Sequence, residues 1–391
     1  MKKSVSPLIA TVLLIAFTVA IGSVVMNWGT CPTNLENEYN ANQFVSVWNT
    51  SLVGTGSSAS NQIKLPLESS GNYSFTVDWG DETQSFITTW NQEDVTHTYD
   101  QEGEYEIKIN GTIIGFTFNN LGDKLKIRDI KQWGDLRLGN SGGYFAGTSN
   151  LNITAIDVLN LTGITILNEM FYISGISNVS RINEWNVSNV RSMLRMFSGA
   201  SFFNQDISLW NVSNVRSMLR MFSGASSFNQ DISSWNVGNV TNMDAMFNVA
   251  SSFNQPLDSW DVSNVNSMSY MFNVASSFNQ PLDSWDVSNV NSMSAMFQGA
   301  SSFNQPLNIW NVSNVKDMNR MFFFASSFNQ PLDNWDVSSV IDMDYAFSSA
   351  SSFNQNISNW CVTNITIEPS YFAYSSPLLS DYKPIWGTCP N

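Results

Sequence analysis

Few side chains in this chain of 391 residues could perform chemistry. His97 is the single histidine, and Asp78, Asp81 and Glu82 form a short carboxylate cluster. A transition-metal cage or a histidine-based catalytic triad needs more histidine and cysteine than the chain supplies. Calcium prefers clustered carboxylate oxygens, although the spacing here is not that of an EF-hand loop. We therefore expect no enzymatic activity and no cofactor, with Asp78, Asp81 and Glu82 as weak calcium candidates.

The three cysteines, Cys31, Cys361 and Cys389, cannot all pair within one chain. Cys361 begins and Cys389 nearly ends the irregular segment at the carboxyl terminus. A disulfide between these two persists outside the cell and, by closing a loop of about 30 residues, contributes roughly 3–4 kcal/mol. We expect a Cys361–Cys389 bond, with Cys31 free or bridging two copies of the chain.

Charge and composition exclude one class of partner. The chain has 32 acidic and 17 basic residues, hence a net charge of −15, and only 13% of its residues are charged. Such a field repels phosphate backbones, so we expect no nucleic-acid partner. With 43% hydrophobic residues the chain can bury a substantial core.

The amino terminus has the pattern of a membrane segment. Met1-Lys2-Lys3 is basic, and Leu8–Met26 carries no charge and would span roughly 28 Å as a helix. The pattern predicts a transmembrane helix over residues 5–27, a linker over 28–42 and an extracellular location for the rest. The alternative is a secretory signal that is cleaved before Ser23.

The run from Lys3 to Ala16, KSVSPLIATVLLIA, resembles the start of archaeal type IV pilin-like proteins. The resemblance implies that residues 1–4 are a signal segment, that a peptidase cuts after Ser4, and that Val5 becomes the new terminus. The helix would then stay on the mature protein, anchor it and possess a surface for self-association.

Residues 43–120 alternate apolar and polar side chains in short runs, such as Tyr73–Val77 and Tyr105–Ile109. Period-two runs separated by glycine turns predict an antiparallel β-sandwich. The segments VDWGD (77–81) and HTY (97–99) resemble those of PKD domains, which are immunoglobulin-like β-sandwiches of surface proteins. The resemblance implies a structural, hydrogen-bonded role for His97, and Glu82 stands where that family commonly has glycine.

Tryptophan recurs every 25 residues between 185 and 360. A constant interval without insertions predicts a solenoid with coils of equal length. In the coil that starts at Trp260, we expect a strand over Trp260–Val262, and the i, i+3, i+4, i+7 spacing of Met268–Ala275 predicts a short helix that Asn264 caps. The Phe-Asn-Gln motif at 278–280 is expected to turn the chain and to pair with neighbouring coils.

The complete unit resembles the BspA-like leucine-rich repeats of microbial surface proteins, over roughly residues 121–391. This resemblance implies degenerate repeats and an amino-terminal cap over 121–180, regular repeats over 181–360 and a carboxyl-terminal cap over 361–391. The expected fold class is therefore mixed: a transmembrane helix, a PKD-like sandwich and a leucine-rich-repeat-like α/β solenoid. The resemblance also implies adhesion or recognition, and it transfers no catalytic residue.

The invariance of the repeat tryptophans favours the core over a carbohydrate-stacking face. Positions that vary from coil to coil are better candidates for recognition, because several of them should reach solvent. Five of them would form an aromatic-rich patch typical of protein interfaces: Tyr270, Arg320, Phe323, Phe324 and Tyr345. The alternative is neutral drift on an exposed helix.

These observations predict a non-enzymatic, membrane-anchored cell-surface protein whose solenoid binds a protein or glycan on another cell or surface. One alternative is a pilin-like filament subunit that associates through its amino-terminal helix. Another is the accessory part of a carbohydrate-active surface enzyme, although no pair of acids in a cleft is identifiable.

Overall fold

The structure is a computed structural model, and it describes residues 39–390. The predicted signal segment with Ser4 and Val5, the membrane helix over 5–27 and Cys31 lie outside the described residues. Within residues 39–390, no helix is long and apolar enough to cross a membrane. Asn42–Asn391 form one compact unit.

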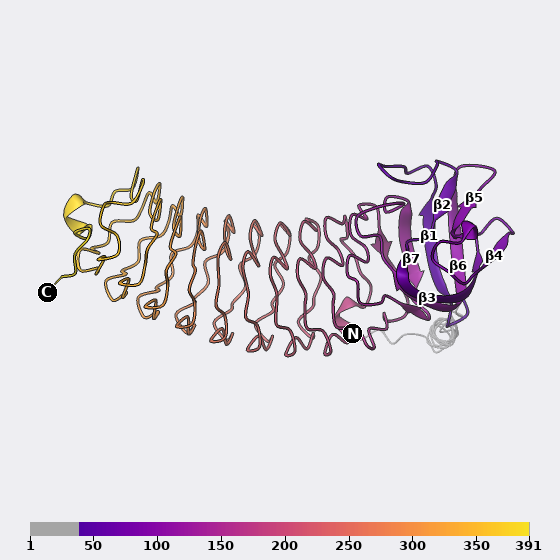
Figure 1. The fold of residues 1–391 in the computed structure, drawn as a ribbon, viewed down its shortest axis with the longest axis horizontal. Coiled ribbons are helices and arrows are strands. Elements are labelled where there is room, and N and C mark those ends of the chain that lie inside the picture. Colours follow the sequence, from indigo (N-terminus) through magenta and orange to yellow (C-terminus); the bar gives the residue numbers. More distant parts are fainter. Residues whose placement is uncertain (1–38, 391) are drawn as a thin grey trace, which may run out of the picture. The chain divides into compact units, whose positions relative to one another are not determined.

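A mixed sheet of seven strands begins this unit (Figure 1). Its strands are β1 (Phe44–Asn49), β3 (Leu67–Asp78), β4 (Gln84–Ile87), β6 (Glu104–Phe116), β7 (Ile127–Gln132), β8 (Leu136–Arg137) and β9 (Asn152–Ile153). The order is β4-β3-β6-β1-β7-β9, and β8 pairs with β6. The β6–β8 and β7–β9 pairs are parallel, whereas β1, β3, β4, β6 and β7 pair with one another in antiparallel fashion. A separate two-stranded ribbon joins β2 (Gln62–Lys64) to β5 (Thr96–Thr98).

The predicted immunoglobulin-like sandwich is therefore wrong. The large sheet is not confined to residues 43–120, and it is not antiparallel throughout. Instead β7, which lies beyond residue 120, pairs with β1, so that Ser46 lies opposite Ile130, and β9 continues the sheet on the other side of β7. The period-two pattern identifies strands with one buried face, but it contains no information about which strand pairs with which.

The predicted α/β coil is also wrong, because the described residues contain no α-helix. Their only helical segments are the 3₁₀ turns η1 (Glu93–Val95), η2 (Ile182–Glu184) and η3 (Ser380–Tyr382). The segment 268–275 forms three overlapping four-residue turns. The amides of Met271, Asn273 and Ala275 each donate to the carbonyl of the residue three positions earlier. Tyr270 (φ 60°) and Val274 (φ 55°) have left-handed backbones, which a helix excludes.

The remaining amides of this segment explain why a helix does not form. Tyr270, Phe272 and Val274 donate to Ser294, Met296 and Gln298 of the next coil at 2.8, 2.9 and 2.6 Å. An α-helix would direct every amide to the residue four positions earlier and leave none for the neighbouring coil. The spacing of the buried Met268, Met271, Phe272 and Ala275 suits one face of a helix, but the overlapping turns bury the same four side chains.

Two further expectations for the coil are wrong. Trp260–Val262 is not a strand, since the regular coils have only isolated parallel bridges, as between Ser267 and Ser292. Asn264 does not cap a helix: its Nδ2 donates to the carbonyl of Gly238 in the preceding coil at 2.7 Å. The side chains of Trp260 and Asn264 both bond to earlier coils and so stabilise the stack. The coils follow one another along the solenoid in sequence order (Figure 1).

The predicted core is confirmed. Trp260 is 3% exposed, and its Nε1 donates to the carbonyl of Ile232, 28 residues earlier, at 3.1 Å. Phe272 stacks on Phe297 with ring centroids 5.7 Å apart, and this ladder runs through the regular coils. Repetition of one ring per coil thus produces a continuous apolar column.

The role of the Phe-Asn-Gln bend is confirmed as well. The amide of Asn279 donates to Asn254 Oδ1 at 2.9 Å, and Gln280 Nε2 donates to the carbonyl and to Oδ1 of Asn254. The side-chain amides therefore satisfy backbone and side-chain groups of the neighbouring bends.

The carboxyl-terminal segment covers the last coil. A disulfide joins Cys361 to Cys389. The amide of Gly387 donates to the carbonyl of Ile365 at 2.8 Å. The buried Phe372 meets Trp386 edge to face with centroids 5.0 Å apart. These contacts hide the final apolar layer, which a solenoid must shield from water.

Candidate functional site

The left-handed position of the first turn places one side chain per coil in a column along the solenoid. Its members are Arg195, Arg220, Ala245, Tyr270, Ala295, Arg320, Tyr345 and, in the cap, Tyr371, all with positive φ. A hydrogen bond from the backbone amide to a carbonyl of the next coil holds this conformation. Tyr345, for example, donates to the carbonyl of Ser370 at 2.9 Å. A residue other than glycine costs about 1–2 kcal/mol in this conformation, and the coil stacking supplies that energy.

At the carboxyl-terminal end of the column, aromatic side chains gather in an aromatic cluster. We define this cluster as Arg320, Phe323, Phe324, Tyr345, Tyr371 and Tyr374. Tyr345 stacks on Tyr371 with centroids 5.0 Å apart, and the Arg320 guanidinium lies 5.1 Å from the centroid of the Tyr345 ring. The ring of Phe323 contacts those of Tyr345 and Phe324, with centroids 5.8 and 4.4 Å apart, respectively.

Much of the aromatic cluster faces solvent. Phe324 is 54% exposed, Tyr371 56% and Tyr374 63%. Tyr371 meets Tyr374 edge to face at 5.5 Å. Contiguous exposed aromatic rings are unusual on a monomer and mark interaction surfaces.

Four of the five residues predicted for the patch come together here: Arg320, Phe323, Phe324 and Tyr345. Tyr270 is exposed but lies two coils away, and Ala295 occupies the intervening place in the column. Tyr371 and Tyr374 were not predicted as site residues. Tyr371 follows Tyr345 by 26 residues instead of 25. Because of this extra residue in the irregular cap, the 25-residue interval does not assign Tyr371 to the same column.

An acidic hollow of about 410 Å³ lies beside the aromatic cluster. Its lining includes Asp342, Asp344 and Glu368, with the exposed Ile341 and Ile367. Asp344 Oδ1 accepts the amide of Ser370 at 2.7 Å, which joins the last regular coil to the cap. In the adjacent coil, burial raises the pKa of Asp317, and the Asp342 carboxylate raises it further. The region therefore suits a partner that presents apolar and basic groups.

The weak calcium candidates occupy one turn. Asp78 accepts the amide of Gly80, and Asp81 accepts bonds from Thr83 and lies 2.7 Å from His97 Nε2. Glu82 has φ 70°, the conformation that a glycine would adopt without strain. In the described part of the chain no group of three histidine, cysteine or acidic side chains is placed to hold a metal.

His97 has a structural environment. Its ring stacks on Trp79 with centroids 4.8 Å apart and meets Tyr99 edge to face at 4.5 Å. Burial acts to raise the pKa of Asp81, but the bonds from Thr83 and His97 outweigh it, so the pKa is lowered. The contact between His97 and Asp81, together with the bonds from Thr83, thus fixes the turn between β3 and β4.

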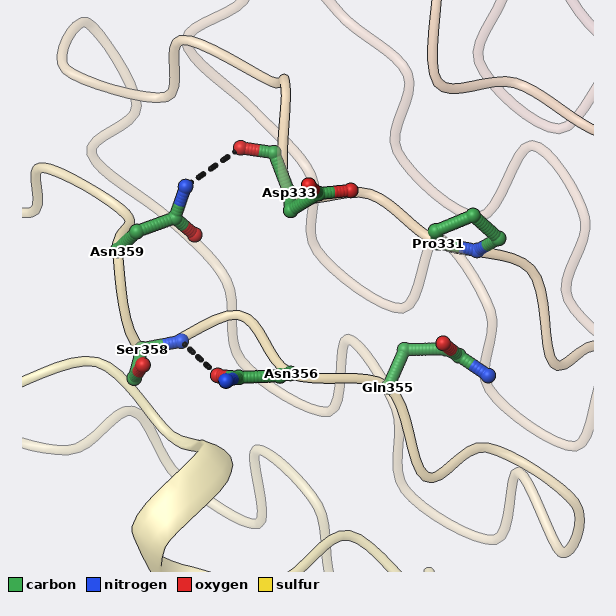
Figure 2. Close-up of a pocket in the computed structure, with 6 residues that line it drawn as sticks. All are labelled: Pro331, Asp333, Gln355, Asn356, Ser358 and Asn359. Atoms are coloured by element: carbon green, nitrogen blue, oxygen red, sulfur yellow. Dashed lines mark hydrogen bonds between the residues drawn. The ribbon is translucent and has the colours of Figure 1, made fainter.

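A second hollow, of about 450 Å³, opens over two coils of the solenoid (Figure 2). It is lined by Pro331, Asp333, Gln355, Asn356, Ser358 and Asn359. Asn359 Nδ2 donates to the carbonyl of Asp333 at 2.7 Å, and the amide of Ser358 donates to Asn356 Oδ1 at 3.0 Å (Figure 2). These hydrogen bonds stabilise the stacking of coils and the turns. The lining contains a single carboxylate, Asp333, so the hollow does not provide the pair of acids that glycoside hydrolysis requires.

One family model matches most of the chain. The family described as "Mycoplasma protein of unknown function, DUF285" matches at residues 116–218, 140–258, 165–284, 229–322 and 278–385. These overlapping matches begin in β6 and run into the cap, so they include all the regular coils. No curated protein and no solved structure matches the chain.

Proposed function

The chain belongs to the DUF285 family, and on this premise we propose that it is a non-enzymatic cell-surface protein whose solenoid recognises a protein on another cell or surface. The observation that carries the proposal is the aromatic cluster at the end of the solenoid. Membership of this repeat family supports a surface repeat protein, and the aromatic cluster is the reason to propose adhesion.

The composition of the aromatic cluster favours a protein partner. Tyrosine, phenylalanine and arginine are enriched at interfaces, where large rings bury area at small cost in side-chain entropy. Arg320 and Tyr345 hold each other in a cation–π pair, and Tyr345 is also stacked on Tyr371. The surface is therefore preorganised, which lowers the entropic cost of binding.

The hollow next to the aromatic cluster adds a charge requirement. Asp342, Asp344 and Glu368 line it, and the whole chain carries a net charge of −15. A partner that buries aromatic or aliphatic side chains against the aromatic cluster and places lysine or arginine over the hollow matches both features.

The test is binding of the fluorescently labelled full chain to a panel of microbial and animal cells. Each cell type is used intact, after protease treatment and after periodate oxidation of surface glycans. Binding that protease abolishes, that periodate spares, and that falls with rising salt supports the proposal. Absence of binding to every cell type, or binding that protease leaves intact, contradicts it.

A further inference from the structure

The β2–β5 ribbon carries a hollow that is separate from the aromatic cluster. Its volume is about 520 Å³, within the range of about 300–1,000 Å³ that small-molecule sites occupy. Its lining includes Gln62, Lys64, Trp90, Glu93, Thr96 and Thr98. This set combines one exposed indole with hydrogen-bonding side chains, of which Lys64 and Glu93 are charged.

The floor of the hollow is the outer face of the ribbon. Gln62 pairs with Thr98, and Lys64 pairs with Thr96, so four polar side chains share one face. Ile63, which alternates with them, is fully buried on the other face. Gln62 Nε2 donates to Thr98 Oγ1 at 2.9 Å, which sets the orientation of both groups.

One wall is the loop that carries Trp90. The side chain of Gln92 holds this loop: its Oε1 accepts the amide of Thr88 at 2.9 Å, and its Nε2 donates to the carbonyl of Phe86 at 2.7 Å. Trp90 is 45% exposed. Its indole is therefore presented to solvent by a loop with a fixed backbone.

This environment differs from that of every repeat tryptophan. Trp260, for example, is 3% exposed and uses its Nε1 within the solenoid, so its ring is not accessible to a ligand. Trp90 lies outside the repeats, and its ring is available for stacking. An indole with an apolar face beside polar groups suits a ligand that is apolar on one side and polar at its edges.

The charges of the hollow cancel. Lys64 and Glu93 are its only charged lining residues, one of each sign. An acidic ligand would also be repelled by the net charge of −15 on the chain. The chemistry therefore favours an uncharged ligand.

We propose that this hollow binds a neutral oligosaccharide. The C–H face of a pyranose ring stacks on Trp90, and its hydroxyl groups bond to Thr96, Thr98, Lys64 and Glu93. The site is independent of the aromatic cluster, so either proposal can fail without the other.

The experiment measures binding of neutral hexasaccharides to the full chain by calorimetry and by tryptophan fluorescence. The probes are maltohexaose, cellohexaose, mannohexaose and chitohexaose. We expect at least one to bind and Trp90→Ala to weaken its binding by about tenfold or more, because the stacking partner is lost. Thr98→Val should weaken it by a smaller factor.

Phe86→Ala is the matched control, since Phe86 is 58% exposed on β4 and its side chain does not line the hollow. Thermal melting of each variant checks that the fold is intact. Binding of no probe by the wild-type chain overturns the proposal, and so does a Trp90→Ala variant that binds as tightly as Phe86→Ala.

Discussion

Tyr345 stacks on Tyr371 with an interplanar angle of 17°, although one belongs to the last regular coil and the other to the irregular cap. The cap therefore continues the column of left-handed positions as well as closing the core. Because the rings pack across this junction, the cap is part of the candidate recognition surface.

The first prediction concerns the tryptophan ladder. Trp260→Ala should lower the free energy of unfolding by about 3–5 kcal/mol, because it removes a buried ring and leaves the carbonyl of Ile232 without its indole donor. Urea unfolding measures the change. Trp90→Ala serves as the control and should leave stability nearly unchanged; equal stability of the two variants would disprove the core assignment.

The second prediction distinguishes turns from a helix. Val274 has φ 55°, whereas Gly199, Gly224 and Gly299 occupy the same place in other coils. Val274→Gly should stabilise the protein by up to about 1 kcal/mol, because a β-branched residue is strained in the left-handed region. In a helix the same change would lower stability, because glycine is a poorer helix former than valine.

Thermal unfolding of Val274→Gly beside Ala275→Gly provides the comparison. Ala275 is buried and has no positive φ, so its replacement should destabilise the coil. A loss of stability in Val274→Gly would support a helix and contradict the turn geometry.

The third prediction concerns pH. The pKa of Asp317 is raised by burial and by Asp342, so the native state binds this proton more tightly than the unfolded state does. The carboxylate consequently lowers stability as the pH rises through its native pKa. Asp317→Asn should be more stable than wild type at pH 7, and the advantage should vanish in acid.

Asn242 shows that an asparagine fits this position, since its Oδ1 accepts the amide of Asp244 at 3.0 Å as Asp317 Oδ1 accepts that of Asn319 at 2.9 Å. Chemical unfolding between pH 3 and pH 8 gives the profile. A stability difference that does not change with pH would show that ionisation of Asp317 is not its origin.

The fourth prediction concerns the cap. The Cys361–Cys389 bond has a sequence separation of 28, and a loop of this size contributes about 3–4 kcal/mol. The double change Cys361→Ser with Cys389→Ser should lower stability by this amount. Cys31→Ser is the control and should unfold like wild type under non-reducing conditions; an equal loss in both would contradict a stapled cap.

The repeat core could be read from the sequence, because a fixed interval places identical rings in register. The backbone of the coil could not, since the spacing of Met268, Met271, Phe272 and Ala275 fits a helix and a run of overlapping turns equally well. The hydrogen bonds from Tyr270, Phe272 and Val274 to the next coil decide between them. The spacing of apolar residues within one coil does not predict hydrogen bonds between coils.

The candidate site was predictable in part. Arg320 and Tyr345 stand out because they vary within an otherwise constant repeat. Tyr371 was missed because an extra residue in the cap breaks the interval, and Trp90 was missed because it belongs to no repeat. Its exposure depends on the bonds of Gln92, which no sequence pattern reveals.

The most direct test of the central claim is quantitative binding of a triple variant to cells that bind the wild-type chain. The variant is Phe324→Ser, Tyr345→Ser and Tyr371→Ser. Serine tolerates the left-handed backbone, as Ser349 and Ser375 show, so folding should be preserved. The matched control is Phe202→Ser, an exposed ring outside the aromatic cluster.

We predict that the triple variant melts like wild type and loses about 2 kcal/mol or more of binding free energy, since interface aromatic residues carry most of the energy of recognition. The Phe202→Ser control should bind normally. A folded triple variant that binds cells as tightly as this control would contradict the account.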